Sequence, residues 1–200
     1  MRLAAVLLAA PLLAATALLA ACGGSSSGQE EHAKASFGVY RNAEAQRKDA
    51  EGALNHAFRD LSSAAGVRDR AGAMAAVGRG EDALQTIYSA LAVEVEAAEA
   101  LARYGPTRDH GGRLRDALRR TRAGAELVDR QLAIASRDPF LDVAANVQQV
   151  HRLSSELLRV SVPAALARRR AVRAIALKLG VEPPVDVLFD LPHRTVTTGG

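Results

Sequence analysis

The sequence predicts an all-α fold: an up-down bundle of four main helices, followed by a basic helical extension and an extended C-terminal tail. Apolar residues recur with the period of an α-helix through most of residues 29–180, and no alternating strand pattern appears before the tail. Glycine and proline divide this span into segments of helical length, and the short connections favour antiparallel neighbours. Alanine supplies about a fifth of the 200 residues and aromatic residues 4%. We therefore expect narrow seams between the helices.

The first helix is predicted from about residue 29 to residue 65, where Gly66 provides a stop. A polar gap over residues 41–49 interrupts its apolar face. That face consists of Phe37, Tyr40, Leu54, Phe58 and Leu61.

The second helix carries the clearest repeat. Two sets of residues recur every seven positions and are offset by three, as in helices that pack along a seam. Gly72, Gly78 and Gly80 weaken its start, so we expect the stable part to begin near Glu81. The segment Gly105–Pro106 ends it. The two sets are Val77, Leu84, Leu91 and Ala98, and Met74, Tyr88, Val95 and Ala102.

Two aspartates mark the expected starts of the third and fourth helices. Asp109 is the expected cap of the third helix, which should end near Ser136. Asp138 should cap the fourth helix, with Pro139 at its first position, where the missing N–H of proline costs nothing. Pro163 should kink or break that helix. The seam residues are Leu114, Leu118, Thr121, Ala125, Val128 and Leu132 for the third helix, and Phe140, Val143, Val147, Val150 and Leu158 for the fourth.

The chain beyond Pro163 differs from the rest. A basic stretch over residues 164–179 should continue as a helical extension or fifth helix up to Gly180. Residues 181–200 form the predicted tail, in which apolar side chains alternate over 185–191 with the period of an extended segment. This segment either lies across its own bundle, which is the favoured interpretation, or binds a partner at a sheet edge or in a groove.

The N-terminus has the pattern of an export signal. Arg2 is followed by an apolar run from residue 3 to residue 20. The end of this run overlaps the motif Leu19-Ala20-Ala21-Cys22, and a Gly/Ser-rich segment comes next. This stretch resembles the signal peptide and lipobox of bacterial lipoproteins. In that pattern a leucine three places before the cysteine and two small residues allow a peptidase to cut in front of the cysteine.

The resemblance implies a signal peptide over residues 1–21, cleavage after Ala21, and a diacylglyceryl thioether on Cys22, often with a further acyl chain on the new amino group. Residues 22–28 would then be the tether and residues 29–180 the bundle. Several acyl chains, at about 0.8 kcal/mol per buried methylene, form a stable anchor. The protein would lie on the extracytoplasmic face of the cell membrane, or on the outer membrane of a cell with two membranes.

An uncleaved transmembrane helix is the alternative for this segment, because about 18 apolar residues can span a bilayer. Pro11, the lipobox and the Gly/Ser tether favour processing over this alternative.

Positive charge is concentrated in the second half of the chain. Residues 22–105 carry 9 basic and 12 acidic side chains, whereas residues 106–200 carry 16 and 10. A basic surface of this kind attracts lipid headgroups, an anionic envelope polymer or an acidic partner protein. The alternative is a solvated face that forms ion pairs with Glu94, Glu96 and Glu99. The basic residues are Arg115, Arg119, Arg122, Arg130 and Arg137 in the third helix, and Arg159, Arg168, Arg169, Arg170, Arg173 and Lys178 in the extension.

The sequence carries no catalytic signature. It has no Gly-x-Ser-x-Gly elbow, no phosphate-binding loop and no metal-ligand spacing among its five histidines. Its single cysteine excludes an intramolecular disulfide. We therefore expect a non-enzymatic protein with no cofactor or metal besides the lipid on Cys22, and export argues against a nucleic-acid partner.

Two functions remain open at this point. The first is an interaction or scaffold module anchored to the membrane. The alternative is a bundle that binds a small ligand or a metal in a pocket formed by Glu81, His151 and Ser154, which the helical periodicity places at the seams. The simpler interpretation, a partly buried histidine with Glu81 exposed, is favoured for this set.

Overall fold

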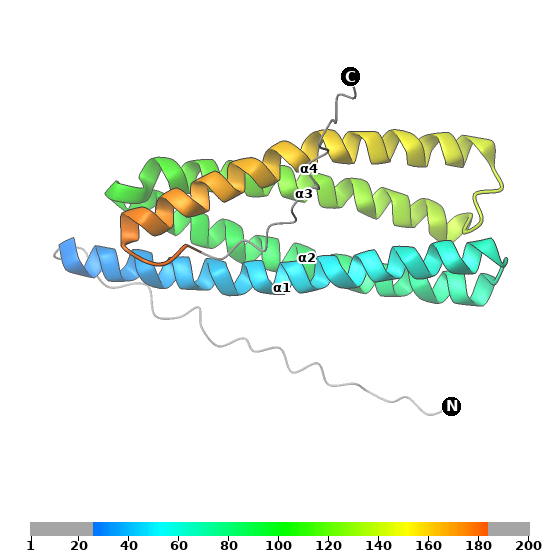
Figure 1. Ribbon diagram of the computed structural model, residues 1–200, viewed down its shortest axis with the longest axis horizontal. Coiled ribbons are helices and arrows are strands. Elements are labelled where there is room, and N and C mark those ends of the chain that lie inside the picture. The colour runs from blue at the N-terminus through cyan, green and yellow to red at the C-terminus, as the bar shows by residue number, and fades with distance from the viewer. Residues whose placement is uncertain (1–25, 184–200) are drawn as a thin grey trace, which may run out of the picture.

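Four long antiparallel helices make up the part of the chain that the structure, a computed structural model, describes: residues 26–183 (Figure 1). The helices are α1 (Ser26–Gly66), α2 (Arg70–Arg103), α3 (Arg108–Arg137) and α4 (Ala144–Leu179), and a short 3-10 helix, η1 (Gly105–Thr107), joins α2 to α3. The predicted all-α up-down bundle is confirmed. The signal segment over residues 1–21, Cys22 and the alternating segment over 185–191 lie outside the described residues.

Two helices begin earlier than the sequence suggests. Helix α1 starts at Ser26, so the last residues assigned to the tether belong to its first turn. Helix α2 starts at Arg70 rather than near Glu81, because the side chain of Asp69 accepts a hydrogen bond from the backbone N–H of Gly72 at 3.0 Å and caps the helix. The glycines that weaken this stretch are compatible with a capped helix.

The connection before α4 also differs from the prediction. Asp138 does not cap a helix beginning at Pro139, because α4 begins only at Ala144. Its carboxylate instead accepts hydrogen bonds from the backbone N–H groups of Asp142 and Val143, at 3.0 and 3.1 Å, and closes the loop ahead of the helix. Asp138 therefore stabilises the loop that leads into α4, although it lies six residues before the first residue of that helix.

The predicted cap of α3 is also displaced. Asp109 lies in the first turn of α3, and Thr107 occupies the N-cap position without a side-chain hydrogen bond at that cap.

Helix α4 runs through Pro163 without a break, so the basic stretch is its second half and not a fifth helix. The ribbon changes direction near the middle of this helix (Figure 1), as expected where a proline removes one hydrogen bond and crowds the preceding turn. Leu158 was expected to face inward but is 65% exposed, and Leu153 is buried in its place. Val143 is exposed as well.

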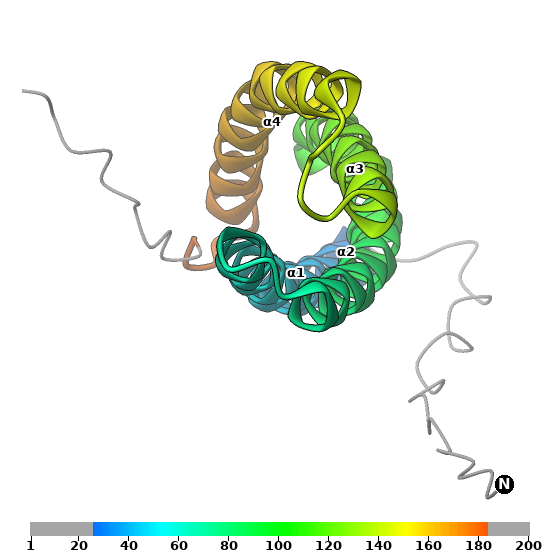
Figure 2. The ribbon, with the colours of Figure 1, turned by 90° about the vertical axis from the view of Figure 1, so that its right-hand side faces the viewer.

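The bundle is packed unevenly around its axis. Helices α1 and α2, α2 and α3, and α3 and α4 contact each other along their lengths, whereas α1 and α4 touch at few residues. Figure 2, looking along the bundle, shows α4 arching over α3 before it approaches α1. Between α2 and α3 the backbones come close, because a Cβ on Gly111 would lie 2.5 Å from the backbone nitrogen of Ala102. No helix among the described residues is long and apolar enough to cross a membrane.

Candidate functional site

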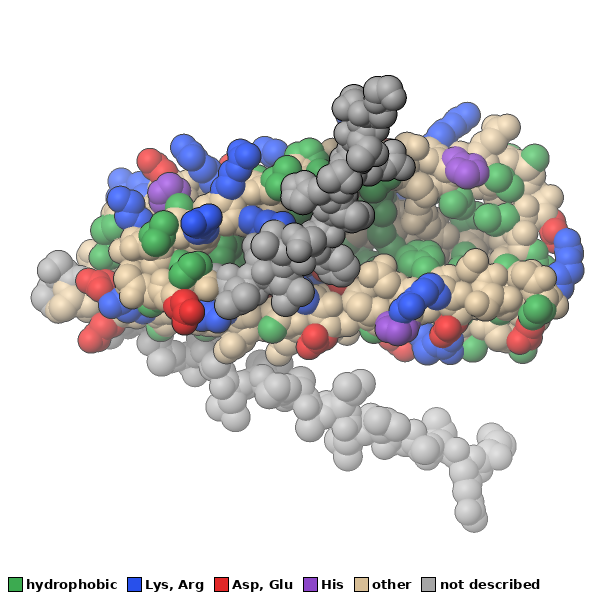
Figure 3. Space-filling view, viewed as in Figure 1, with side chains coloured by type: hydrophobic (Ala, Val, Ile, Leu, Met, Phe, Trp, Pro, Cys, Tyr) green, Lys and Arg blue, Asp and Glu red, His purple; other side chains and the backbone are tan. Residues whose placement is uncertain are grey.

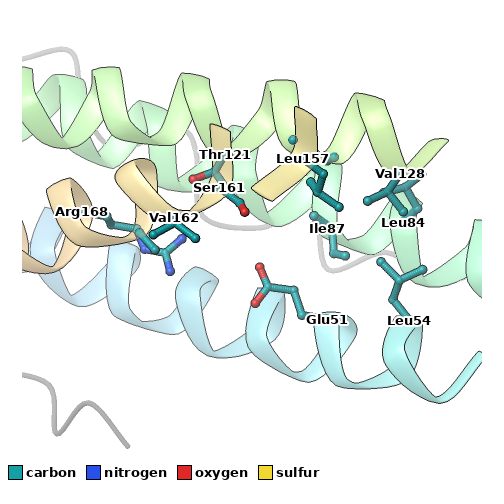
Figure 4. A pocket seen from close by; sticks show the side chains of 13 residues that line it. Glu51, Leu54, Leu84, Ile87, Thr121, Val128, Leu157, Ser161, Val162 and Arg168 are labelled. Carbon is teal, nitrogen blue, oxygen red and sulfur yellow. The ribbon is translucent and has the colours of Figure 1, made fainter. Parts of the chain in front are cut away.

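The side of the bundle between α1 and α4 contains a cavity of about 330 Å³, which we call the seam cavity (Figure 4). One part of it is aliphatic, and Figure 3 shows a hollow with apolar side chains between the two helices. The other part is polar: Glu51 on α1 and Ser161 on α4 extend toward the space between the helices, and Arg168 lies at its end. The aliphatic wall is formed by Leu54, Leu84, Ile87, Ala125, Val128, Leu157, Val162 and Ala165, with Gly124.

A buried charge cluster adjoins the polar end of this cavity. It consists of Glu44, Arg47, Glu94 and Arg168, whose side chains are at most 12% exposed, and of Glu51, whose side chain is 42% exposed. The Nε of Arg47 donates to Oε1 of Glu94 at 2.9 Å, and neither side chain has any exposed surface. Arg47 also donates to Glu51, and its Nη2 lies 3.8 Å from Oε1 of Glu44. The Nε of Arg168 lies 3.9 Å from that same oxygen of Glu44, so this carboxylate connects α1 to α4.

Several buried polar atoms around this cluster have no hydrogen-bond partner within the described residues. They are the hydroxyl of Tyr40, Nη2 of Arg47, Oε2 of Glu94 and Nε of Arg168. Most buried polar groups in folded proteins are paired, and each unpaired group costs about 1–3 kcal/mol. Of these four residues, Arg168 also lines the seam cavity, so its side chain links the buried cluster to the cavity.

The protonation equilibria of the cluster follow from its burial. Burial raises the pKa of Glu94 above its ordinary value of 4.5, and Arg47 only partly offsets this shift. For Arg47, burial lowers the pKa, but the carboxylates of Glu94 and Glu51 outweigh it, so the pKa is raised. Burial, and then the nearby Glu44 and Glu94, raise the pKa of Tyr40 well above 10.0.

Sequence reasoning missed this cluster, although a signal for it exists. Glu44 and Arg47 lie in the polar gap of the first helix, where they continue the spacing of Phe37 and Tyr40 through to Leu54. On α2, Glu94 occupies a seam position between Leu91 and Ala98. Charged residues at seam positions of two neighbouring helices indicate a buried ion pair, whereas Glu94 is considered above only as an ion-pair partner of the basic face.

A second feature is a basic groove between α3 and α4, with a cavity of about 420 Å³. It lies at the end of the bundle where α1 begins (Figure 1), and Figure 3 shows Lys and Arg side chains gathered at that end. Within the described residues, Arg113, Arg120 and Arg170 form no ion pair within 4.0 Å of an acidic group. The charged and imidazole side chains that line the groove are His110, Arg113, Asp116, Arg120 and Arg170.

The basic residues predicted to contact an anionic surface separate onto different faces of α4. Arg168 points inward, with a side chain 12% exposed, and belongs to the buried charge cluster. Arg170 lines the basic groove. Arg169, Arg173 and Lys178 are exposed. The basic flank of α3 pairs with α2 in part, since Arg119 lies 3.9 Å from Glu99.

The predicted pocket of Glu81, His151 and Ser154 does not form. Glu81 and His151 are exposed, and Ser154 accepts a hydrogen bond from Nε2 of Gln131 at 2.9 Å. None of the three lines the seam cavity or the basic groove. His151 was expected to face inward, but the inward position of this turn is taken by Leu153. Across residues 26–183, no group of three or more His, Cys, Asp or Glu side chains is arranged to hold a metal ion.

The lipid attachment residue Cys22 and the recognition residues Leu19, Ala20 and Ala21 lie outside the described residues. A scan against protein-family models finds no match to this chain, and comparisons with curated proteins and with solved structures find none either. The function is therefore inferred from the residues of the cavity, the cluster and the groove.

Proposed function

We propose that this protein is a non-enzymatic, lipid-anchored module of the bacterial cell envelope that holds its helical bundle against an anionic membrane surface through the basic groove. The observation that carries the proposal is the position of the groove. Three of its arginines, Arg113, Arg120 and Arg170, form no ion pair with the described residues and lie at the end of the bundle where α1 begins.

The tether is short enough to keep this end near the membrane. Helix α1 begins at Ser26, four residues after Cys22, and four extended residues span at most about 14 Å. A lipid on Cys22 would therefore hold the basic groove within reach of the headgroups. Each arginine near an anionic surface contributes about 1 kcal/mol, and this attraction falls off within about 8 Å at physiological salt.

The anchor is tested by changing Cys22. We expect Cys22→Ala to release the protein from membranes or to block its maturation, because the sulfur is the proposed site of lipid attachment. Fractionation of cells followed by mass spectrometry of the N-terminus measures both effects. Normally cleaved Cys22→Ala protein that stays on the membrane would refute lipid anchoring.

The groove is tested separately with the mature, unlipidated chain (residue 22 onward, Cys22→Ser) and vesicles. Binding to phosphatidylglycerol-containing vesicles should exceed binding to pure phosphatidylcholine vesicles and should weaken as salt is raised. Replacing Arg113, Arg120 and Arg170 by Gln removes about 3 kcal/mol, or about a hundredfold in affinity.

A matched triple variant of the other flank of α3 controls for net charge. Arg122→Gln, Arg130→Gln and Arg137→Gln remove the same charge, and we expect a much smaller loss of vesicle binding. Equal losses in the two triple variants would show that charge alone, and not the groove, determines the attraction. Vesicle binding that does not depend on anionic lipid would direct attention to an acidic polymer or protein partner.

A further inference from the structure

We infer that the seam cavity is a binding site for an uncharged single-chain glycerolipid, with the hydrocarbon chain on the aliphatic wall and the glycerol at Glu51, Ser161 and Arg168. This site is separate from the basic groove, on the opposite side of α4, and it does not depend on how the protein is anchored. It also differs in place from the pocket expected from the sequence, because none of the residues expected there lines it.

The shape and lining of the cavity favour one flexible aliphatic chain. A volume of about 330 Å³ accommodates one aliphatic chain of medium length along this wall. The residues that line the cavity include no aromatic side chain, so nothing in it favours a planar ring over a hydrocarbon chain.

The exposed apolar surface beside the cavity supports the same conclusion. Leu158, Val162 and Leu166 repeat every four residues on α4 and are 65%, 53% and 49% exposed. Exposed aliphatic side chains that continue from the lining of a cavity are typical of a ligand-binding surface, and Val162 is the member of this row that reaches the cavity.

The polar end selects a head that both donates and accepts hydrogen bonds. Arg168 brings donors, and its buried Nε has no hydrogen-bond partner within residues 26–183. Glu51 brings acceptors, and Ser161, whose hydroxyl makes no hydrogen bond to the described residues, can do both. Glu51, the carboxylate that lines the cavity, repels an anionic head, and Glu44 already opposes the charge of Arg168 at 3.9 Å. The hydroxyl groups of glycerol match such a mixed set without adding charge.

The test uses the mature chain, beginning at residue 22 with Cys22→Ser, and 1-decanoylglycerol below its aggregation concentration. Native mass spectrometry should show one bound lipid, and calorimetry should give saturable 1:1 binding. Decanoate should bind at least tenfold more weakly, because it is anionic and lacks the hydroxyl groups of glycerol. Decanoate binding as tightly as 1-decanoylglycerol would overturn the proposed head site.

Two variants fill the cavity, and a third serves as their control. Ala165→Leu adds volume inside it, and Val162→Phe adds volume at its mouth on a side chain that is already exposed, where folding tolerates the change. Each should lower the affinity at least tenfold. Ala167→Leu, two residues along α4 but lining the basic groove instead, should leave it within twofold.

Three further results would overturn the inference. The first is an absence of binding at 100 times the protein concentration, and the second is an equal loss of affinity in Val162→Phe and Ala167→Leu. The third is binding that appears only after residues 184–200 are deleted, which would make the C-terminal segment of the chain the occupant of the seam.

Discussion

Arg47→Met should be among the most destabilising single changes in this bundle. Glu94 has no exposed surface, and Arg47 is its hydrogen-bond donor within the described residues. Replacing the arginine by a side chain of similar length leaves a buried carboxylate without a partner. Breaking a buried ion pair in this way costs about 3–5 kcal/mol, a large share of the 5–15 kcal/mol that holds a typical domain folded.

The reciprocal change should cost less, because the two partners are not equivalent. In Glu94→Met, Arg47 retains its hydrogen bond to Glu51 and its proximity to Glu44. The expected loss is that of one charged hydrogen bond, about 1.5–3 kcal/mol. The double variant should be more stable than Arg47→Met alone, since two apolar side chains of matching size replace both charges.

Urea unfolding followed by circular dichroism measures these free energies, and their pH dependence provides an independent check. A carboxyl whose folded pKa is raised binds protons more tightly in the folded state, so its contribution to stability declines as pH rises from 4.5 through the raised pKa. Without Arg47 that pKa rises further. The penalty of Arg47→Met should therefore be largest at pH 7 and shrink toward pH 4.5. The reasoning is refuted if Glu94→Met costs as much as Arg47→Met, or if the penalty does not depend on pH.

Two further predictions concern the packing and the loops. Gly111→Ala should destabilise the bundle by about 1–3 kcal/mol, because its Cβ would lie 2.5 Å from the backbone of Ala102. Gly112→Ala, which has open space around it, should stabilise the bundle by about 0.5–1 kcal/mol. Thermal unfolding of both variants measures these changes, and equal effects of the two substitutions would contradict the prediction. Hydrogen bonds from Asn146 and from the backbone of Val143 lower the pKa of Asp138 below 3.8. The stabilising effect of this carboxylate is therefore present above pH 3.8 and is lost as pH falls through the lowered pKa. Asp138→Asn should lower the thermal unfolding midpoint at pH 7 but make little difference at pH 2.

The helical architecture is predictable from the sequence because a heptad pattern identifies buried positions before any contact is known. Leu84 and Leu91 of the repeat lie in the core, as do Leu114 and Leu118 of α3. The first residue of a helix is harder to predict. For α2 it depends on whether Asp69 or a later residue accepts a hydrogen bond from the backbone N–H groups of the first turn. Gly80 shows why propensity misleads: it lies in the contact between α2 and α3, where a Cβ would come within 3.0 Å of the Leu132 side chain, so the absence of a side chain aids packing.

The candidate sites are less predictable, because they depend on which helices leave a gap. Sequence periodicity predicts an inward face for each helix, but it does not show that α1 and α4 touch at few residues while the other neighbouring pairs pack along their lengths. The pocket expected at His151 does not form for a different reason: the buried face of the fourth helix includes Leu153, whereas His151 lies in solvent. The seam cavity lies further along the same helix.

The run Arg168-Arg169-Arg170 shows how a helix separates what the sequence presents as one cluster. Successive residues on an α-helix point about 100° apart, so Arg168 extends toward Glu44 on α1 while Arg170 lines the groove beside Arg113 and Arg120 on α3. The first is part of a buried network, and its charge is opposed by a carboxylate. The second has no acidic partner within the described residues, and its field reaches solvent. A change at Arg168 therefore reports on the seam cavity and a change at Arg170 on the basic groove, so the two proposals can fail independently of each other.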